Sequence, residues 1–182
     1  MDMIEYKLLR TEDIISFIKD AHEDINKTLD LNEKDADLLN LENYYGASTA
    51  GFWCILENNH IIGTIGLRPV ANTKNICGEI RRLYIHPDWQ NKGIGSELID
   101  FVINFAKSKS YEKLRATTSF DRTVIIYLLQ KKGFYQIQKY RESSADLFFE
   151  IALKPKYQEL YNDLSHSISE GEKYFKNTLI LN

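Results

Sequence analysis

The sequence lacks the features that would place it in a membrane, a secretory pathway or a metal-dependent class. It contains no run of about 18 apolar residues, so no transmembrane helix is predicted. Its first ten residues alternate charged and apolar side chains and lack the apolar centre of a signal peptide. Its two cysteines, Cys54 and Cys77, fit no metal-binding spacing and are more typical of small buried hydrophobic residues. We therefore expect a cytoplasmic chain with neither a metal site nor a membrane partner.

The sequence also lacks the excess of positive charge that is typical of nucleic-acid-binding proteins. It has 23 lysines and arginines against 26 aspartates and glutamates, which gives a net charge of −3. A modestly acidic chain is compatible with a cationic, amine-bearing substrate. The length of 182 residues and the hydrophobic content of 43% favour one globular domain with room for a terminal extension.

The most informative segment joins an apolar strand to an amphipathic helix, and it reads Leu83-Tyr-Ile-His-Pro-Asp-Trp-Gln90-Asn-Lys-Gly93-Ile-Gly95-Ser96. A helix begins with unpaired N–H groups and a partial positive charge, and glycines allow a bulky anion to approach the backbone. The segment therefore predicts a site for a phosphate-bearing ligand. Its spacing is Q-x-x-G-x-G, which does not match the G-x-x-x-x-G-K-S/T pattern of a P-loop. It is not a dinucleotide fingerprint either, because Leu98 stands where the third glycine is needed.

Hydrophobic periodicity and turn residues predict the other elements of the chain. Thr11 and Asp121 are expected to cap two of the helices. The predicted helices cover residues 11–22, part of 23–45, 96–109 and 121–133. The predicted strands cover residues 5–10, 51–57, 60–67, 78–85, 113–118, 134–141 and 146–153, with a polar loop at 68–77. The order β-α-α-β-β-β-α-β-α-β-β indicates an α/β fold with a mixed sheet.

The character of the chain changes after Pro155. An apolar stripe between Tyr157 and Ile168 predicts a helix, and residues 174–181 are compatible with a strand. We expect residues 155–182 to form a C-terminal extension outside the main unit. Because such a stripe needs a packing partner, we hypothesise that the extension contributes to a homodimer.

Four segments in this order resemble the GNAT (GCN5-related N-acetyltransferase) superfamily. They are the Q-x-x-G-x-G loop, the hairpin 52–67, the strand 79–87 and the K-x-G-F sequence that ends at Phe134. The resemblance runs from about residue 3 to residue 154, so we expect a GNAT-type domain at 1–154. It implies transfer of an acetyl group from acetyl-CoA to a primary amine by direct attack, without a covalent enzyme intermediate.

The resemblance also implies which residues hold the cofactor. The loop would bind the pyrophosphate, and the preceding strand would pair with the pantetheine arm through its backbone. A backbone N–H near Ile85 would face the thioester carbonyl and stabilise the oxyanion that develops there. The resulting set of cofactor-binding residues is Leu83, Tyr84, Ile85, Gln90, Asn91, Lys92, Gly93, Ile94, Gly95 and Ser96.

Glu79 is the candidate general base, because the family often carries a glutamate eleven residues before the loop glutamine. A partly buried carboxylate would have a raised pKa and be a better base. The alternatives for Glu79 are an ion pair with Arg81 or Arg82, or a solvated strand end. Leu129 stands where many family members have the tyrosine that protonates the leaving thiolate. The acid is therefore recruited from another position such as Tyr84 or Tyr135, supplied by water, or absent.

The acceptor is the least defined part of the prediction. The resemblance places it between residues 22–50 and 142–145. Four acidic side chains in or next to these segments could attract a cation or form a solvated face: Asp35, Asp37, Glu42 and Asp146. A small amine, an antibiotic, an amino acid and a peptide N-terminus all stay open as acceptors. Two other functions also stay open, namely transfer of a different acyl group and a non-catalytic acyl-CoA sensor.

Overall fold

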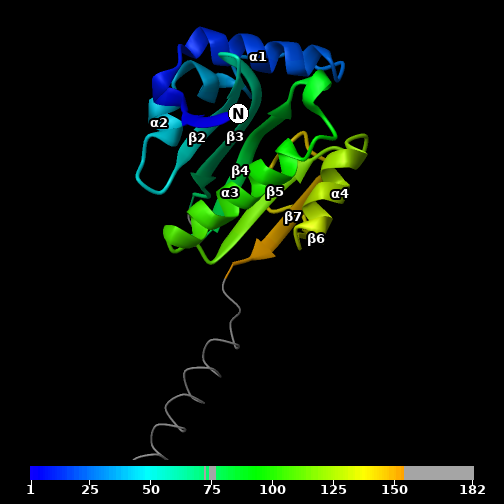
Figure 1. Ribbon diagram of the computed structural model, residues 1–182. Helices are drawn as coiled ribbons and strands as arrows, with labels where there is room; N and C mark the ends of the chain where they lie inside the picture. The colour runs from blue at the N-terminus through cyan, green and yellow to red at the C-terminus, as the bar shows by residue number, and fades with distance from the viewer. Residues whose placement is uncertain (72, 74–76, 154–182) are drawn as a thin grey trace, which may run out of the picture.

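The computed structural model describes residues 1–71, 73 and 77–153 of the chain. Within these residues a single seven-stranded sheet has the order β1-β2-β3-β4-β5-β7-β6 (Figure 1). Every neighbouring pair is antiparallel except β4 and β5, which are parallel. The strands are β1 (Asp2–Glu5), β2 (Gly51–Glu57), β3 (His60–Pro69), β4 (Cys77–Ile85), β5 (Lys113–Thr118), β6 (Tyr135–Ile137) and β7 (Leu147–Ala152). The predicted mixed α/β sheet is confirmed.

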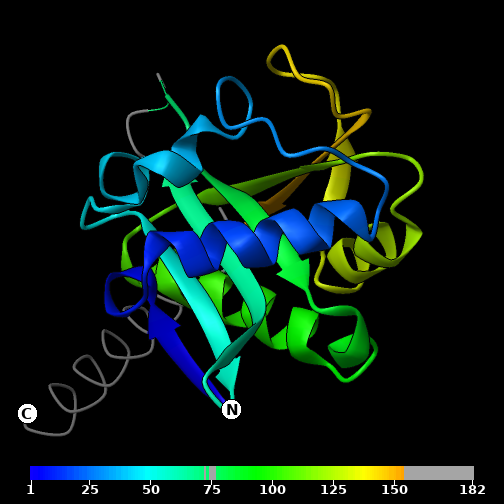
Figure 2. The same ribbon diagram turned by 90° about the horizontal axis from the view of Figure 1, so that it is seen from above.

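Helices cover both faces of this sheet. The longer ones are α1 (Thr11–Glu23), α3 (Ile94–Ser108) and α4 (Thr123–Lys131), and α2 (Leu41–Tyr45) is a little over one turn. Short 3-10 turns lie at Tyr6–Leu8, Ala36–Leu39 and Pro87–Trp89. Helices α1 and α2 pack on one face, and Figure 2 shows α1 lying across the strands. Helices α3 and α4 pack on the other face.

Two apolar clusters fill the space between the sheet and these helices, and β2 contributes to both. Trp53 faces α3 and packs edge-on against Phe101 and Phe105, at ring-centroid distances of 5.0 and 4.8 Å. Cys54, the next residue, faces α1 and α2, because successive strand residues point to opposite faces. Cys54 and Cys77 are both buried as free thiols, and burial raises the pKa of Cys54 to about 12. The interpretation of both cysteines as small core residues is confirmed.

The ends of several elements differ from the sequence prediction. The first strand was expected at residues 5–10 but lies at Asp2–Glu5, because Ile4 pairs with Cys54 and the chain then turns so that Tyr6 enters the core. Thr11 is the first residue of α1 rather than its cap, and Arg10 precedes it. Strands β3 and β4 extend into the predicted loop 68–77.

The second half of the chain shows three further corrections. Helix α3 begins at Ile94, two residues early, because Gly93 before it takes a left-handed conformation. Helix α4 begins at Thr123, and no side chain caps it, so the expected cap at Asp121 is wrong. The predicted strand 134–141 ends at Ile137, because the following segment leaves the sheet.

None of the described helices is both long enough and apolar enough to cross a membrane. The predicted helix at 157–168 and the predicted strand at 174–181 lie outside the described residues. The division of the chain at residue 154 and the homodimer hypothesis therefore stay predictions.

Candidate active site

The site lies where two parallel strands stop pairing. The ladder between β4 and β5 joins Cys77–Glu79 to Lys113–Arg115 and ends there, although β4 continues to Ile85 and β5 to Thr118. A cavity of about 680 Å³ occupies the opening between them. It is lined by residues 80–84 of β4 and 116–119 at the end of β5. A strand edge that is left unpaired presents N–H and C=O groups to which an extended ligand can add as a further strand.

Strand β4 carries a bulge on the wall of this cavity. Its register against β3 shifts between Thr64 and Gly66, so that Arg82 and Leu83 stand opposite the single residue Ile65. Arg82 has φ of 55°, a left-handed conformation that is uncommon for any residue other than glycine. Bulges of this kind redirect the strand and are frequent beside active sites. The bulge therefore changes which backbone and side-chain groups β4 presents to the cavity.

Buried ion pairs hold Arg82 in this conformation. Its Nη1 donates to Asp35 Oδ1 at 2.6 Å and its Nε donates to Asp37 Oδ2 at 3.1 Å. Tyr45 also donates to Asp37, at 2.6 Å, and all three charged side chains are about 5% exposed or less. Burial opposes the ionisation of Asp37, but the hydrogen bonds and charge of Arg82 outweigh it and lower the pKa of that carboxyl.

In the structure, each of the four acidic side chains that were predicted to attract a cation or form a solvated face has a partner within the protein. Asp35 and Asp37 are neither solvated nor free for a ligand, because Arg82 occupies both. Glu42 accepts a hydrogen bond from Tyr6. Asp146 accepts one from the Phe120 amide at 3.2 Å. The interpretation of this set as a cation-attracting or solvated face is wrong for Asp35 and Asp37.

The glycine loop offers free amides at the start of α3. Asn91 and Gly93 have φ of 58° and 88°, which turn the chain sharply into the helix. The first hydrogen bond of the helix runs from the Glu97 amide to the Gly93 carbonyl at 3.0 Å. The amides of residues 91–96 donate to no described residue. A run of unpaired N–H groups at a helix N-terminus is suited to bind phosphate oxygens.

Neighbouring side chains fix the shape of this loop. Gln90 donates from Nε2 to the Ile85 carbonyl at 3.2 Å, so it ties the loop to the end of β4. The Lys92 ammonium lies 4.6 Å from the ring centroid of Trp89, over its face. A Cβ at Gly95 would approach Leu128 of α4 to 3.1 Å, so the small residue allows α3 and α4 to pack closely.

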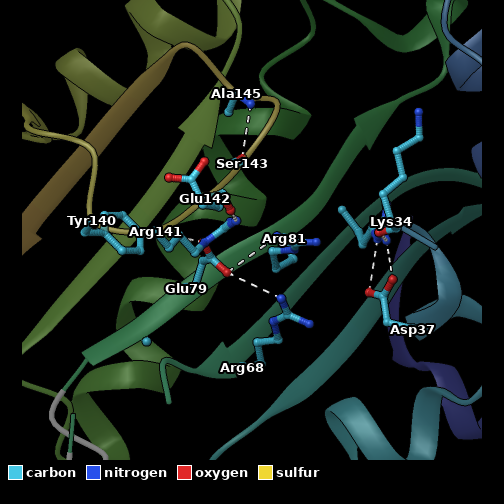
Figure 3. A network of polar contacts seen from close by, with 12 residues as sticks. Lys34, Asp37, Arg68, Glu79, Arg81, Tyr140, Arg141, Glu142, Ser143 and Ala145 are labelled. Carbon is cyan, nitrogen blue, oxygen red and sulfur yellow. Dashed lines mark hydrogen bonds and ion pairs between the residues drawn. The ribbon is translucent and has the colours of Figure 1, made fainter. Parts of the chain in front are cut away.

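Glu79 lies at the point where the two strands part, in the centre of a polar cluster (Figure 3). Its Oε1 accepts from Tyr140 at 2.6 Å and from Arg141 at 2.6 and 3.1 Å. Its Oε2 lies 3.5 Å from Arg81 and 3.6 Å from Arg68. Glu79 is 3% exposed. The segment after β6 leaves the sheet to bring Tyr140 and Arg141 to this carboxylate.

The expected raised pKa of Glu79 is wrong. Burial alone would raise it, but the charge of Arg81 and the hydrogen bonds from Tyr140 and Arg141 outweigh burial and lower the pKa of Glu79. The alternative of an ion pair with Arg81 agrees with the structure, whereas Arg82 pairs elsewhere. A carboxylate with a lowered pKa is a weaker base, so its role as the general base stays a prediction.

Some of the predicted cofactor residues line the cavity and others do not. Leu83 and Tyr84 line it, Ile85 packs into the apolar core beneath it, and the loop 90–96 lies outside its lining. Leu129 lines the cavity too, and Tyr135 does not. The two segments expected to grip the acceptor also reach the wall: His22, Ile25, Lys27, Thr28, Lys34 and Asp35 from the first, and Glu142–Ala145 from the second.

A histidine–tyrosine pair faces the cavity from the side of α1. His22 Nε2 lies 2.7 Å from the Tyr84 hydroxyl, and both residues line the cavity. Burial lowers the pKa of His22 and raises the pKa of Tyr84. Tyr84 was predicted from the sequence as a site residue, whereas His22, Arg68 and Arg141 were not. No local pattern marks these residues, because they meet the site only through contacts between distant segments.

Comparisons with known proteins agree with this geometry. The sequence profile described as the acetyltransferase (GNAT) family matches residues 16–134. A solved GNAT-family acetyltransferase of Staphylococcus aureus Mu50 is 26% identical with a TM-score of 0.75, and the match covers 84% of this chain and 99% of that one. The protein yncA of Salmonella typhimurium, solved with its cofactor acetyl-CoA, is 18% identical with a TM-score of 0.64, over 85% and 94% of the two chains.

Among curated sequences, the glucosamine 6-phosphate N-acetyltransferase of Schizosaccharomyces pombe is 39% identical over 62 residues, which is 32% of this chain and 56% of that protein. The chain spans between 33% and 56% of the length of the curated relatives that it matches. The family profile covers well over half of the chain, and the diverging strands, the bulge and the glycine loop lie inside the matched range. The chain belongs to the GNAT family of acetyltransferases.

Proposed function

We propose that this chain transfers an acetyl group from acetyl-CoA to a primary amine by direct attack. The observation that carries the proposal is the continuity between the unpaired edge of β4 and the free amides at the start of α3. Together they form one backbone surface. The edge of β4 can pair with an extended thiol arm, and the amides at the start of α3 can bind a diphosphate.

The proposed roles of the cofactor residues follow from their positions. The amides of residues 91–96 bind the pyrophosphate, and Gln90 holds the loop in place through its bond to the Ile85 carbonyl. The backbone of Leu83–Ile85 pairs with the pantetheine arm. Acetyl-CoA supplies an activated acyl group as a thioester. A preset N–H near Ile85 would stabilise the developing oxyanion, which is worth about 3 kcal/mol per donor.

The proton of the attacking amine needs an acceptor, because such amines have an ordinary pKa near 10. Glu79 is proposed for this role, and the test is the variant Glu79→Gln. If Glu79 is the base, this substitution lowers kcat/KM about 100-fold and leaves CoA affinity nearly unchanged. The acidic limb of the pH profile of kcat/KM is then also lost. A fall that leaves the shape of the pH profile intact would assign Glu79 to positioning its arginine partners instead.

One experiment tests the whole proposal. Binding of CoA is titrated by calorimetry, and release of free thiol from acetyl-CoA is measured across a panel of amines. The panel includes glucosamine 6-phosphate, because a relative carries that acceptor in its name. Binding and turnover support the proposal. Binding without turnover on any amine would favour an acyl-CoA sensor, and turnover with a longer acyl-CoA alone would favour another acyl group. Absence of CoA binding would refute the proposal.

A further inference from the structure

The cavity wall is far more basic than the chain as a whole. The chain carries a net charge of −3, yet seven cationic side chains line the cavity against two acidic ones, Asp35 and Glu142. The cations come from the segment after α1, from β3 and β4, from the residue before α4 and from the segment between β6 and β7. They are Lys27, Lys34, Arg68, Arg81, Arg82, Arg122 and Arg141.

Three of these arginines share one carboxylate. Arg68, Arg81 and Arg141, here called the arginine cluster, all lie within ion-pair distance of Glu79 (Figure 3). A single negative charge cannot neutralise three guanidinium groups, so the cluster keeps an excess of positive charge. Arg82 is excluded from this count, because two aspartates already balance it.

Two members of the cluster keep donor groups available. Arg68 and Arg81 approach Glu79 only at 3.6 and 3.5 Å, and neither side chain donates a hydrogen bond to a described residue. Their side chains are 26% and 19% exposed, so they are partly withdrawn from water yet reach the cavity. Burial and the charge of Arg68 lower the pKa of Arg81. Partly buried guanidinium groups with free N–H donors are suited to bind an oxyanion in a forked geometry.

The position of the cluster separates it from the proposed phosphate loop. Arg81 and Ile85 pair with Gly66 and Gly63 of β3, so they lie about 10 Å apart at the rise of a strand, and the loop begins beyond Ile85. Arg141 enters from the segment between β6 and β7, on the side where the acceptor is expected. The cluster therefore faces the acceptor part of the cavity rather than the diphosphate part.

We infer that the amine acceptor carries a carboxylate or phosphate group, and that the arginine cluster binds this anion. The inference rests on the proposed function, because only that function defines an acceptor. The anion supplies the negative charge that Glu79 alone does not, while the amine of the same molecule extends along the cavity toward Leu83. Glu79 holds the three guanidinium groups in place for this anion, whichever of its two roles the Glu79→Gln test supports. The expected substrate is a small zwitterion rather than a purely cationic amine.

The test compares acceptors that differ only in their anion. Phosphoethanolamine is paired with ethanolamine, and β-alanine with propylamine, at saturating acetyl-CoA. We expect at least a 10-fold higher kcat/KM for the anionic member of one pair, and the two pairs distinguish phosphate from carboxylate. Arg81→Gln should reduce that preference by about 10- to 100-fold, mainly through a higher KM for the anionic member of the pair. Arg10→Gln is the matched control, because Arg10 is exposed and pairs with Asp13 outside the cavity.

Failure of this inference is distinguishable from failure of the proposed function. Equal or better turnover of the neutral amines, with CoA bound, would overturn the inference and leave the acetyltransferase intact. An equal loss for both members of a pair in Arg81→Gln would also overturn it. If no amine is turned over, binding of phosphoethanolamine and β-alanine to the wild type and the variant is measured by calorimetry. This measurement shows whether the arginine cluster binds the anion. Binding that is lost in the variant supports the cluster, and no binding refutes it. Arg68→Gln replaces Arg81→Gln if the latter does not fold.

Discussion

The bulge in β4 depends on a buried ion-pair network that can be tested with one substitution. Asp37→Asn keeps the volume of the side chain but removes its charge. In the wild type, Asp37 accepts from Arg82 through both carboxylate oxygens and from Tyr45 at 2.6 Å. All of these groups are buried, so the surrounding water cannot replace the lost charge. Asp35 stays as a charged partner of Arg82 at 2.6 Å, and the Lys34 carbonyl still accepts from Arg82 Nη2 at 3.2 Å.

The magnitude follows from the burial of the network. Breaking a buried ion pair by removing one partner costs about 3–5 kcal/mol, and the remaining Asp35 places the expected loss near the lower end, at about 3 kcal/mol. This is a large part of the 5–15 kcal/mol that typically separates folded and unfolded states. Because Arg82 holds φ of 55° only while the network restrains it, we also expect the bulge to relax and kcat/KM to fall beyond the loss of folded protein.

The assay is urea denaturation followed by circular dichroism at several pH values, beside thiol release at neutral pH. The pKa of Asp37 is lowered in the folded state, so its stabilisation is complete above the usual pKa of 3.8 and is lost as the pH falls through the folded value. The difference in unfolding free energy between wild type and Asp37→Asn should therefore become smaller as the pH falls. Tyr45→Phe is the control, because it removes one hydrogen bond of about 1 kcal/mol and leaves the ion pairs intact.

Two outcomes would contradict these expectations. If Asp37→Asn unfolds within 1 kcal/mol of wild type, a value well below that of a broken buried pair, and turns over normally, then the network does not hold Arg82. If Tyr45→Phe is as damaging as Asp37→Asn, then the hydrogen bond from the Tyr45 hydroxyl, rather than the charge of Asp37, explains the loss.

Three further predictions concern the rest of the site. Gly93→Ala places a Cβ on a residue with φ of 88°, so we expect a loss of about 1 kcal/mol in unfolding free energy and weaker CoA binding by calorimetry, and unchanged affinity would argue against the loop. The pKa of Glu79 is lowered, so its stabilisation is complete above about pH 4.5 and lost below it, and the Tm of Glu79→Gln should fall less than that of wild type on acidification. Tyr84→Phe leaves buried His22 Nε2 without its partner, so we expect a loss of about 1–3 kcal/mol in urea denaturation, and wild-type stability would show that the contact at 2.7 Å contributes nothing.

The acceptor side of the site illustrates the limit of sequence reasoning. The sequence allowed Asp35 and Asp37 to attract a cation or to form a solvated face, because nothing in their neighbourhood along the chain revealed a partner. Their partner is Arg82, more than forty residues away. Because Asp35 and Asp37 are paired with Arg82, they do not offset the other cations of the cavity, and the arginine cluster is its dominant charged feature.

The sequence by itself determined the order of the elements, the mixed sheet and the glycine loop. These depend on local properties, namely hydrophobic periodicity, turn residues and the backbone freedom of Gly93, which neighbouring residues alone can express. Only the tertiary structure decided how charge is distributed around the cavity. Glu79 meets Arg141 across 62 positions of sequence, and burial then makes its ionisation depend on that contact. Electrostatics acts through space and through local dielectric, and the linear order of residues encodes neither.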